Sequence, residues 1–69
     1  MRDVQITHEP VELYKIIKFE GLASSGALAK EAVARGEVAV NGAIETQKRK
    51  KIVAGDIISF AGETLRIVL

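Results

Sequence analysis

The hydrophobic period of this chain changes once, near Gly36, and that change constrains the fold more than any other feature. Before it, apolar residues recur every three to four positions, which is typical of one face of a helix. After it, they alternate with polar residues, which is typical of a strand with one buried face. Helices followed by a run of short strands indicate the α+β class. We therefore predict two N-terminal helices, in a helix–turn–helix, followed by a small, mostly antiparallel β-sheet.

The first helix is predicted over residues 10–20. Pro10 suits the first helical position, where its missing N–H is not needed. Gly21 stands where a left-handed C-cap belongs, and Leu22 can fold back onto the last turn. The apolar stripe of this helix consists of Leu13, Ile16 and Ile17.

The second helix is predicted over residues 25–35. Ser24 and Ser25 can both act as its N-cap, and Gly36 ends it. Glu31 and Arg35 are spaced as an i,i+4 ion pair. Its apolar face consists of Leu28, Ala29, Ala32 and Val33.

Short strands are predicted over most of the remaining chain. Asn41-Gly42, between Val38–Val40 and Ile44, is the strongest two-residue hairpin signal. Lys48–Lys51 is too charged for a core strand and is predicted as a loop. Val4 and Ile6 alternate as a candidate edge strand within an irregular segment 1–8. Further β segments are expected at 52–53, 57–60 and 65–68, with turns at 55–56 and 61–63.

Length and composition narrow the class of protein. Sixty-nine residues correspond to a single domain, which we place over 1–69. The chain contains no cysteine, so neither a disulfide nor a thiolate metal site supplements its core. We expect no secretory leader, because no basic-then-apolar segment follows Met1, and no apolar run approaches the ~20 residues that span a membrane. We expect a soluble, cytoplasmic, monomeric protein without a membrane partner.

Catalytic and metal sites are not predicted. His8 is the only histidine, and a metal site needs several ligands. The carboxylates are scattered, and no nucleophile–base spacing is recognisable. We therefore expect no enzyme activity, no metal, no cofactor and no small-molecule substrate. Phe19 and Phe60 are predicted in the core, and so few aromatic residues argue against single-strand binding by base stacking.

The charge distribution carries the functional signal. The formal net charge is only +1, but residues 48–69 hold five basic and two acidic side chains, whereas residues 1–47 hold five and seven. Four of the positive charges are consecutive, at Lys48–Lys51. Fixed positive charges neutralise neighbouring phosphates and release counterions, which favours nucleic-acid binding. The ordinary alternative is a solvated loop.

The start of the second helix is a further candidate. Helix N-termini bind phosphate through free N–H groups, and Gly26 permits close approach; the alternative is an ordinary N-cap. Lys30 leans back toward that end, because helical side chains tilt N-terminally. The candidate RNA-binding residues are Lys18, Ser25, Gly26, Lys30, Arg35, Lys48, Arg49, Lys50 and Lys51.

Residues 13–60 resemble the α-L RNA-binding motif of ribosomal small-subunit protein four, pseudouridine synthases and bacterial tyrosyl-tRNA synthetases. The match comprises Gly21, Ser25, Ala29-Lys30, the Gly-x-Val-x-Val-Asn-Gly pattern at 36–42 and Gly-Asp-Ile-Ile at 55–58. The chain looks most like the small stand-alone bacterial members of that family. Those carry Ser/Thr-Gly-Gly-x-Ala-Lys at the helix start, where this chain has Ser25-Gly26-Ala27-Leu28-Ala29-Lys30, and a Glu followed by a basic run, here Glu45 through Lys51.

The resemblance implies structured RNA, ribosomal or transfer-like, as the partner. Larger members place arginines after the serine where this chain has Gly26-Ala27, so the basic loop should carry more of the binding. A protein-interaction adaptor that docks an acidic partner through the same loop is the alternative. A sulfur-carrier protein is disfavoured, because it would end in Gly-Gly rather than Ile67-Val68-Leu69.

Overall fold

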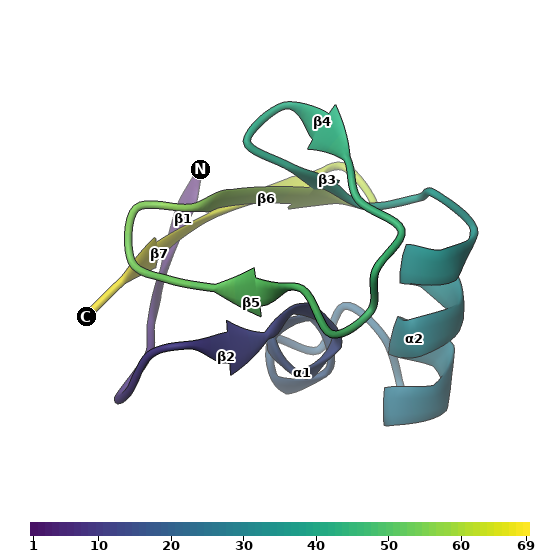
Figure 1. Cartoon of the computed structure of the whole chain (residues 1–69), viewed down its shortest axis with the longest axis horizontal. Coiled ribbons are helices and arrows are strands. Elements are labelled where there is room, and N and C mark those ends of the chain that lie inside the picture. Colours follow the sequence, from purple (N-terminus) through teal and green to yellow (C-terminus); the bar gives the residue numbers. More distant parts are fainter.

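The computed structural model describes all residues, 1–69, and has the predicted α+β architecture. Two helices lie side by side against a five-stranded sheet, and a two-stranded ladder runs next to the first helix (Figure 1). None of the helices is long and apolar enough to cross a membrane. The elements are β1 (Arg2–Gln5), β2 (Val11–Glu12), α1 (Leu13–Phe19), α2 (Gly26–Ala34), β3 (Ala39–Val40), β4 (Ala43–Ile44), β5 (Lys51–Ile52), β6 (Ile57–Phe60) and β7 (Glu63–Val68).

Helix α1 begins at Leu13, three residues later than predicted. Pro10 is therefore not its first residue, and the peptide bond before it is cis. The reason is that Val11 and Glu12 form strand β2, which pairs with Ile52 and Lys51 of β5. The predicted C-cap is confirmed: Gly21 has φ +75°, and the N–H of the next residue donates to Ile17 O.

Helix α2 begins and ends close to the predicted positions. Ser25 is its N-cap, and Ser25 Oγ accepts a hydrogen bond from the Leu28 N–H at 3.1 Å. Three of the four predicted apolar residues are buried, at Ala29, Ala32 and Val33. Leu28 was predicted with them but is 49% exposed, because it lies at the edge of the stripe that Ala29, Ala32 and Val33 form on the helix.

The main sheet has the order β1-β7-β6-β3-β4 and is mixed. All its neighbours are antiparallel except β1 and β7, which are parallel with Val4 opposite Ile67. The predicted edge strand at the N-terminus is therefore confirmed, but the expectation that the helices precede the whole sheet is wrong. The Asn41-Gly42 hairpin is confirmed between β3 and β4, with φ of +53° and +84°, as a type I′ turn requires.

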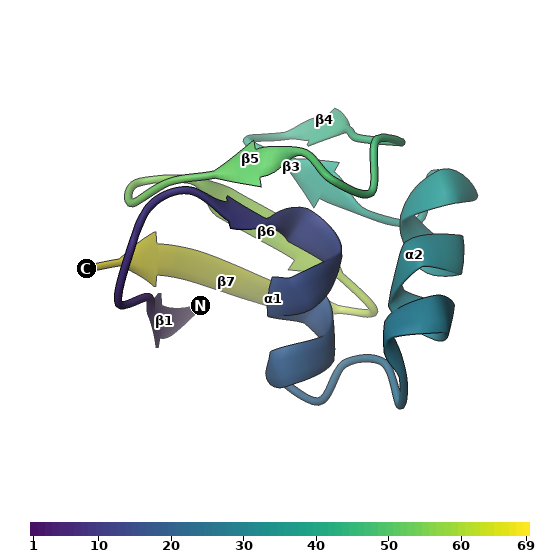
Figure 2. The same ribbon diagram turned by 60° about the horizontal axis from the view of Figure 1, so that its bottom comes forward.

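The core lies between the helices and one face of the sheet. Figure 2 shows α1 in front of β6 and β7, with α2 beside it. No polar or charged residue is buried. Phe60 packs at the edge of the core, whereas Phe19 is 69% exposed, so its predicted place in the core is wrong. The largest fully buried side chains are Leu13, Ile17, Val33, Val38, Ile52, Ile58, Leu65 and Ile67.

Candidate nucleic-acid interface

Tyr14, on the first turn of α1, brings together cations from two other segments. The Nζ atom of Lys30, on α2, lies 4.7 Å from the centroid of the Tyr14 ring, and Cζ of Arg49, between β4 and β5, lies 5.7 Å from it. Both distances are within the range of cation–π attraction, about 6 Å. The ring is half-buried and packs against the core, so it offers both cations a fixed surface.

Lys18 reaches the same place from the next turn of α1. A Cβ atom added at Gly26 would lie 3.8 Å from Lys18 Cδ and 3.9 Å from Tyr14 Cε2. The start of α2 therefore rests on these two side chains. We call Tyr14, Lys18, Lys30 and Arg49 the Tyr14 cluster. It draws one or more residues from α1, from α2 and from the β4–β5 loop.

The β4–β5 loop is anchored to α1 through its backbone. The N–H of Leu13 donates to Lys50 O at 2.9 Å, and the N–H of Tyr14 donates to Lys48 O at 3.1 Å. Helix α1 has no side-chain N-cap, so these loop carbonyls satisfy N–H groups that the helix leaves without partners. The basic run is thereby held against the helix, although Lys51 belongs to β5 and not to the predicted loop.

Glu12 is the one acidic side chain that forms an ion pair with a member of the Tyr14 cluster, and it also pairs with Lys15. Its Oε1 lies 3.3 Å from Lys15 Nζ, and its Oε2 accepts a hydrogen bond from Arg49 Nη1 at 3.3 Å. Partial desolvation raises the pKa of the Glu12 carboxyl, but the hydrogen bonds from Lys15 and Arg49 lower it by more, so the pKa lies below its ordinary value. Glu12 therefore stays ionised between two cations.

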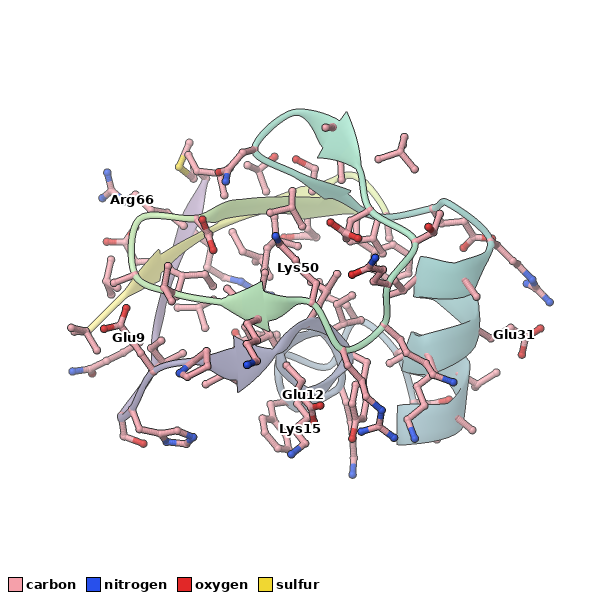
Figure 3. The ribbon with its side chains drawn as sticks, in the orientation of Figure 1. Glu9, Glu12, Lys15, Glu31, Lys50 and Arg66 are labelled. Atoms are coloured by element: carbon pink, nitrogen blue, oxygen red, sulfur yellow. The ribbon has the colours of Figure 1, made fainter.

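Lys51, Lys50 and Arg35, which were also predicted to bind RNA, lie outside the Tyr14 cluster. Lys51 stands opposite Glu12 in the β2–β5 ladder, on the exposed face of that ladder. Figure 3 shows Lys50 on the other side of β5 from Glu12 and Lys15. Arg35 follows the far end of α2, where it pairs with Glu31 and, at 3.9 Å, with Glu37. Lys50 and Arg35 therefore lie apart from the other predicted RNA-binding residues.

Sequence reasoning did not single out Tyr14 or Glu12. The i,i+4 spacing of Tyr14 to Lys18 was nevertheless a readable signal. No local pattern links Glu12 to Arg49, which is 37 positions away. Ser25 caps α2 as predicted, and its Oγ is occupied by that role. No group of three or more His, Asp and Glu side chains is close enough to hold a metal ion.

One protein-family model and two curated relatives match most of this chain. The family model described as the S4 domain matches residues 4–68. YbcJ of Escherichia coli (strain K12), named as a candidate RNA-binding protein, is 54% identical over 61 residues, which cover 88% of this chain and 87% of the relative. A YbcJ protein of Shigella flexneri, named as uncharacterised, matches over the same shares.

A solved structure also matches. The solution structure of YbcJ from E. coli, described as revealing an ALFAL motif involved in RNA binding, superposes with a TM-score of 0.76 at 48% identity. The match covers 100% of this chain and 89% of that one. The resemblance drawn from the motif series is thereby confirmed.

Proposed function

Because the chain belongs to the S4-domain family, we propose that it binds structured RNA, ribosomal or transfer-like, mainly through the phosphate backbone. The observation that carries this proposal is the Tyr14 cluster, in which Lys30 and Arg49 lie over the Tyr14 ring and the Lys18 side chain lies beside the ring at the start of α2. With a net charge of only +1, the protein offers a polyanion no general attraction. Binding must then rest on such a local concentration of positive charge.

The proposed contacts differ in kind. Arg49 can engage two phosphate oxygens through its planar guanidinium group, whereas Lys18 and Lys30 act as point charges. The first N–H groups of α2, beside Gly26, have no partner inside the helix and add the positive end of its dipole. These groups contact phosphates and do not distinguish one base from another. The shape of the RNA would therefore determine which RNA is bound.

The candidate residues now fall into an order. The Tyr14 cluster comes first, with Lys48 and Lys51 flanking it on the anchored segment. Lys50 and Arg35 come last, since the former is turned away and the latter is paired with acidic neighbours. Ser25 contributes through the shape of the helix start.

Salt-dependent titration tests the proposal. Fluorescence anisotropy of a labelled RNA stem–loop, repeated over a salt series, should give a slope of log K against log salt of about −2 to −4, for roughly three to five phosphate contacts. Polyglutamate of equal charge is the competitor, because the pairing of Glu12 with Lys15 and Arg49 shows that carboxylates suit this surface. Equal affinity for the two polymers would favour the adaptor function instead.

The identity of the RNA requires an experiment in cells. Cross-linking the protein to bound RNA, followed by sequencing, should enrich structured ribosomal or transfer RNA segments over their abundance in the lysate. A variant lacking Lys30 and Arg49 is the matched control, and it should lose that enrichment. Enrichment that is the same for both proteins would contradict a role for the Tyr14 cluster.

A further inference from the structure

Phe19 is the largest side chain that the fold leaves exposed beside the basic surface. It is the last residue of α1, and 69% of it is accessible to solvent. Leu13, Ile16 and Ile17 fill the core from the same helix, and Phe19 lies at the margin of the stripe that they form. Single exposed apolar side chains are common and need no explanation by themselves. Phe19, however, forms part of a groove.

This groove lies between α1 and the segment that joins β1 to β2. Its volume is about 170 Å³, well below the roughly 300–1,000 Å³ of pockets that hold drug-sized molecules. Val4, Ile6 and Ile16 line it and are each no more than 8% exposed. Phe19 is therefore the most accessible apolar side chain of the groove, with half-buried Val11 beside it, and its ring can cover one flat ring of a ligand.

The groove is continuous with the candidate RNA surface. A second, adjoining hollow shares Phe19 with the first and is also lined by Lys15. Lys15 pairs with Glu12, which in turn pairs with Arg49 of the Tyr14 cluster. The Nζ atom of Lys18, another member of that cluster, lies 5.9 Å from the Phe19 ring centroid. Two lysines thus flank the ring on the side that leads to the cluster.

We propose that Phe19 stacks against one unpaired base of the RNA whose backbone the Tyr14 cluster holds. The inference rests on the proposed function and adds a nucleotide contact to it. A nucleotide combines a flat face for the ring with phosphates for Lys15 and Lys18. A protein partner suits this surface less well. Stable protein–protein interfaces bury about 1,200–2,000 Å² in total, whereas here Phe19 is the one large exposed side chain above the buried residues Val4, Ile6 and Ile16.

Two RNA duplexes of equal charge test this stacking. Both carry the same single-stranded 3′ extension, but in one of them the extension is abasic, so only the bases differ. The parent protein should bind the base-bearing duplex about five-fold or more tightly, as expected for stacking of one base. Phe19→Ala should abolish that ratio and leave the affinity for the abasic duplex unchanged.

Ile44→Ala is the matched control, since Ile44 is 65% exposed on β4 and lies outside the groove. It should keep the ratio, and equal thermal midpoints of the three proteins would show that the fold is intact. A ratio near one in the parent, or an undiminished ratio in Phe19→Ala, overturns the inference. So does self-association of the parent in sedimentation that Phe19→Ala abolishes without changing the ratio.

The two proposals fail separately in this experiment. Binding of the abasic duplex depends on the phosphate contacts of the Tyr14 cluster and its neighbouring lysines, without a base for Phe19, and tests the proposed function. Loss of the base-dependent ratio with that binding intact removes only the stacking contact. A parent protein that binds neither duplex removes the proposed function, and the stacking contact falls with it.

Discussion

Arg49 donates a hydrogen bond to Glu12 across 37 positions of the sequence, with Arg49 Nη1 3.3 Å from Glu12 Oε2. The contact joins the residue before α1 to the middle of the basic run. It accompanies the backbone bonds from Leu13 and Tyr14 to the carbonyls of that run. Glu12 therefore both orients Arg49 and places a negative charge among the cations that we propose for RNA.

The charge of Glu12 should oppose RNA binding more than its orienting effect supports it. At about 4–8 Å in water, one unit charge repels another by roughly 0.5–1 kcal/mol. Glu12→Gln should thus raise the affinity for stem–loop RNA by about two- to five-fold at low salt. Glu63→Gln, on the β6–β7 hairpin, removes the same charge outside the cluster and serves as the control. Weaker binding of Glu12→Gln would show that orientation of Arg49 matters more.

Asn41 should determine stability and not binding. It has φ +53°, its Oδ1 accepts from the Ile57 N–H at 2.9 Å, and its Nδ2 donates to Asp56 at 3.0 Å. Asn41→Ala loses these bonds and places a Cβ-bearing residue without a polar side chain in the left-handed region. We expect a loss of about 2 kcal/mol in the free energy of unfolding, measured by urea denaturation.

Asn41→Gly separates the two causes of that loss. Glycine adopts the left-handed region without cost but makes neither side-chain hydrogen bond. It should therefore be less destabilised than Asn41→Ala. Both variants should bind stem–loop RNA like the parent where they are folded, since the hairpin lies away from the Tyr14 cluster. Reduced affinity in either variant would extend the interface to β3 and β4.

Acid should weaken the pairing of β1 with β7. Arg66 donates two hydrogen bonds to Asp3, at 3.0 and 3.1 Å, and these hold the pKa of Asp3 below its ordinary value of 3.8. A carboxyl with a depressed pKa stabilises the fold above its unfolded pKa, and this contribution is lost as the pH falls through the folded pKa. The small difference in thermal midpoint between the parent and Asp3→Asn should therefore be constant above about pH 5 and shrink steadily as the pH falls below 3.8 toward the folded pKa.

Glu63→Gln is the comparison for this pH series, because no ion pair involves Glu63. Its midpoint should follow that of the parent over the whole range. A difference between the parent and Asp3→Asn that grows on acidification would reverse the sign and contradict the assigned role of Asp3.

Local signals in the sequence predicted local structure well. Gly21, Ser25 and Asn41-Gly42 each act through backbone conformation or a bond within a few residues, and each has the predicted role. The same holds for the turn at Ala61-Gly62, where both residues have positive φ. Such features depend on neighbouring residues alone, so one sequence is enough to predict them.

Pairings between distant segments could not be predicted in this way. The parallel β1–β7 pair joins Val4 to Ile67, and no turn between them specifies the register. Strand β2 likewise depends on β5, which explains why the Pro10 signal was misread as a helix start. Phe19 lies three positions after Ile16, at the margin of the helical stripe, so its exposure depends on how far the N-terminal segment covers α1.

The candidate site was predicted in part for the same reason. Basic residues could be counted from the sequence, and Lys30 and Arg49 do meet at Tyr14. Arg35 lies apart from this site because it follows the last residue of α2, whereas Tyr14 lies beside the first. The two ends of a nine-residue helix are about 12 Å apart. The contribution of Glu12 required the β2–β5 pairing, which is not local.

Removing the anchored charges together should show whether the basic run binds RNA. Arg49→Ala with Lys50→Ala and Lys51→Ala should weaken stem–loop binding severely, and the salt slope should become less steep by about two units, since Lys50 is turned away. Surface substitutions usually change stability by under about 0.5 kcal/mol each, so the thermal midpoint should stay close to that of the parent. A triple variant that binds like the parent would reduce the run to a solvated segment.

Three single substitutions, each of which removes one positive charge, test whether the position of the charge matters for RNA binding. Lys30→Ala and Arg49→Ala each remove one cation from the Tyr14 ring, and each should weaken stem–loop binding by about five-fold at low salt and lower the salt slope by about one. Arg35→Ala removes the same charge at the far end of α2, where Glu31 and Glu37 already pair with it. Its affinity should stay within about two-fold of the parent, because Arg35 lies at the opposite end of α2 from the Tyr14 cluster and pairs with two acidic side chains, whereas Arg49 pairs with one. Three equal losses in the same anisotropy titration would mean that total charge, and not the Tyr14 cluster, governs binding.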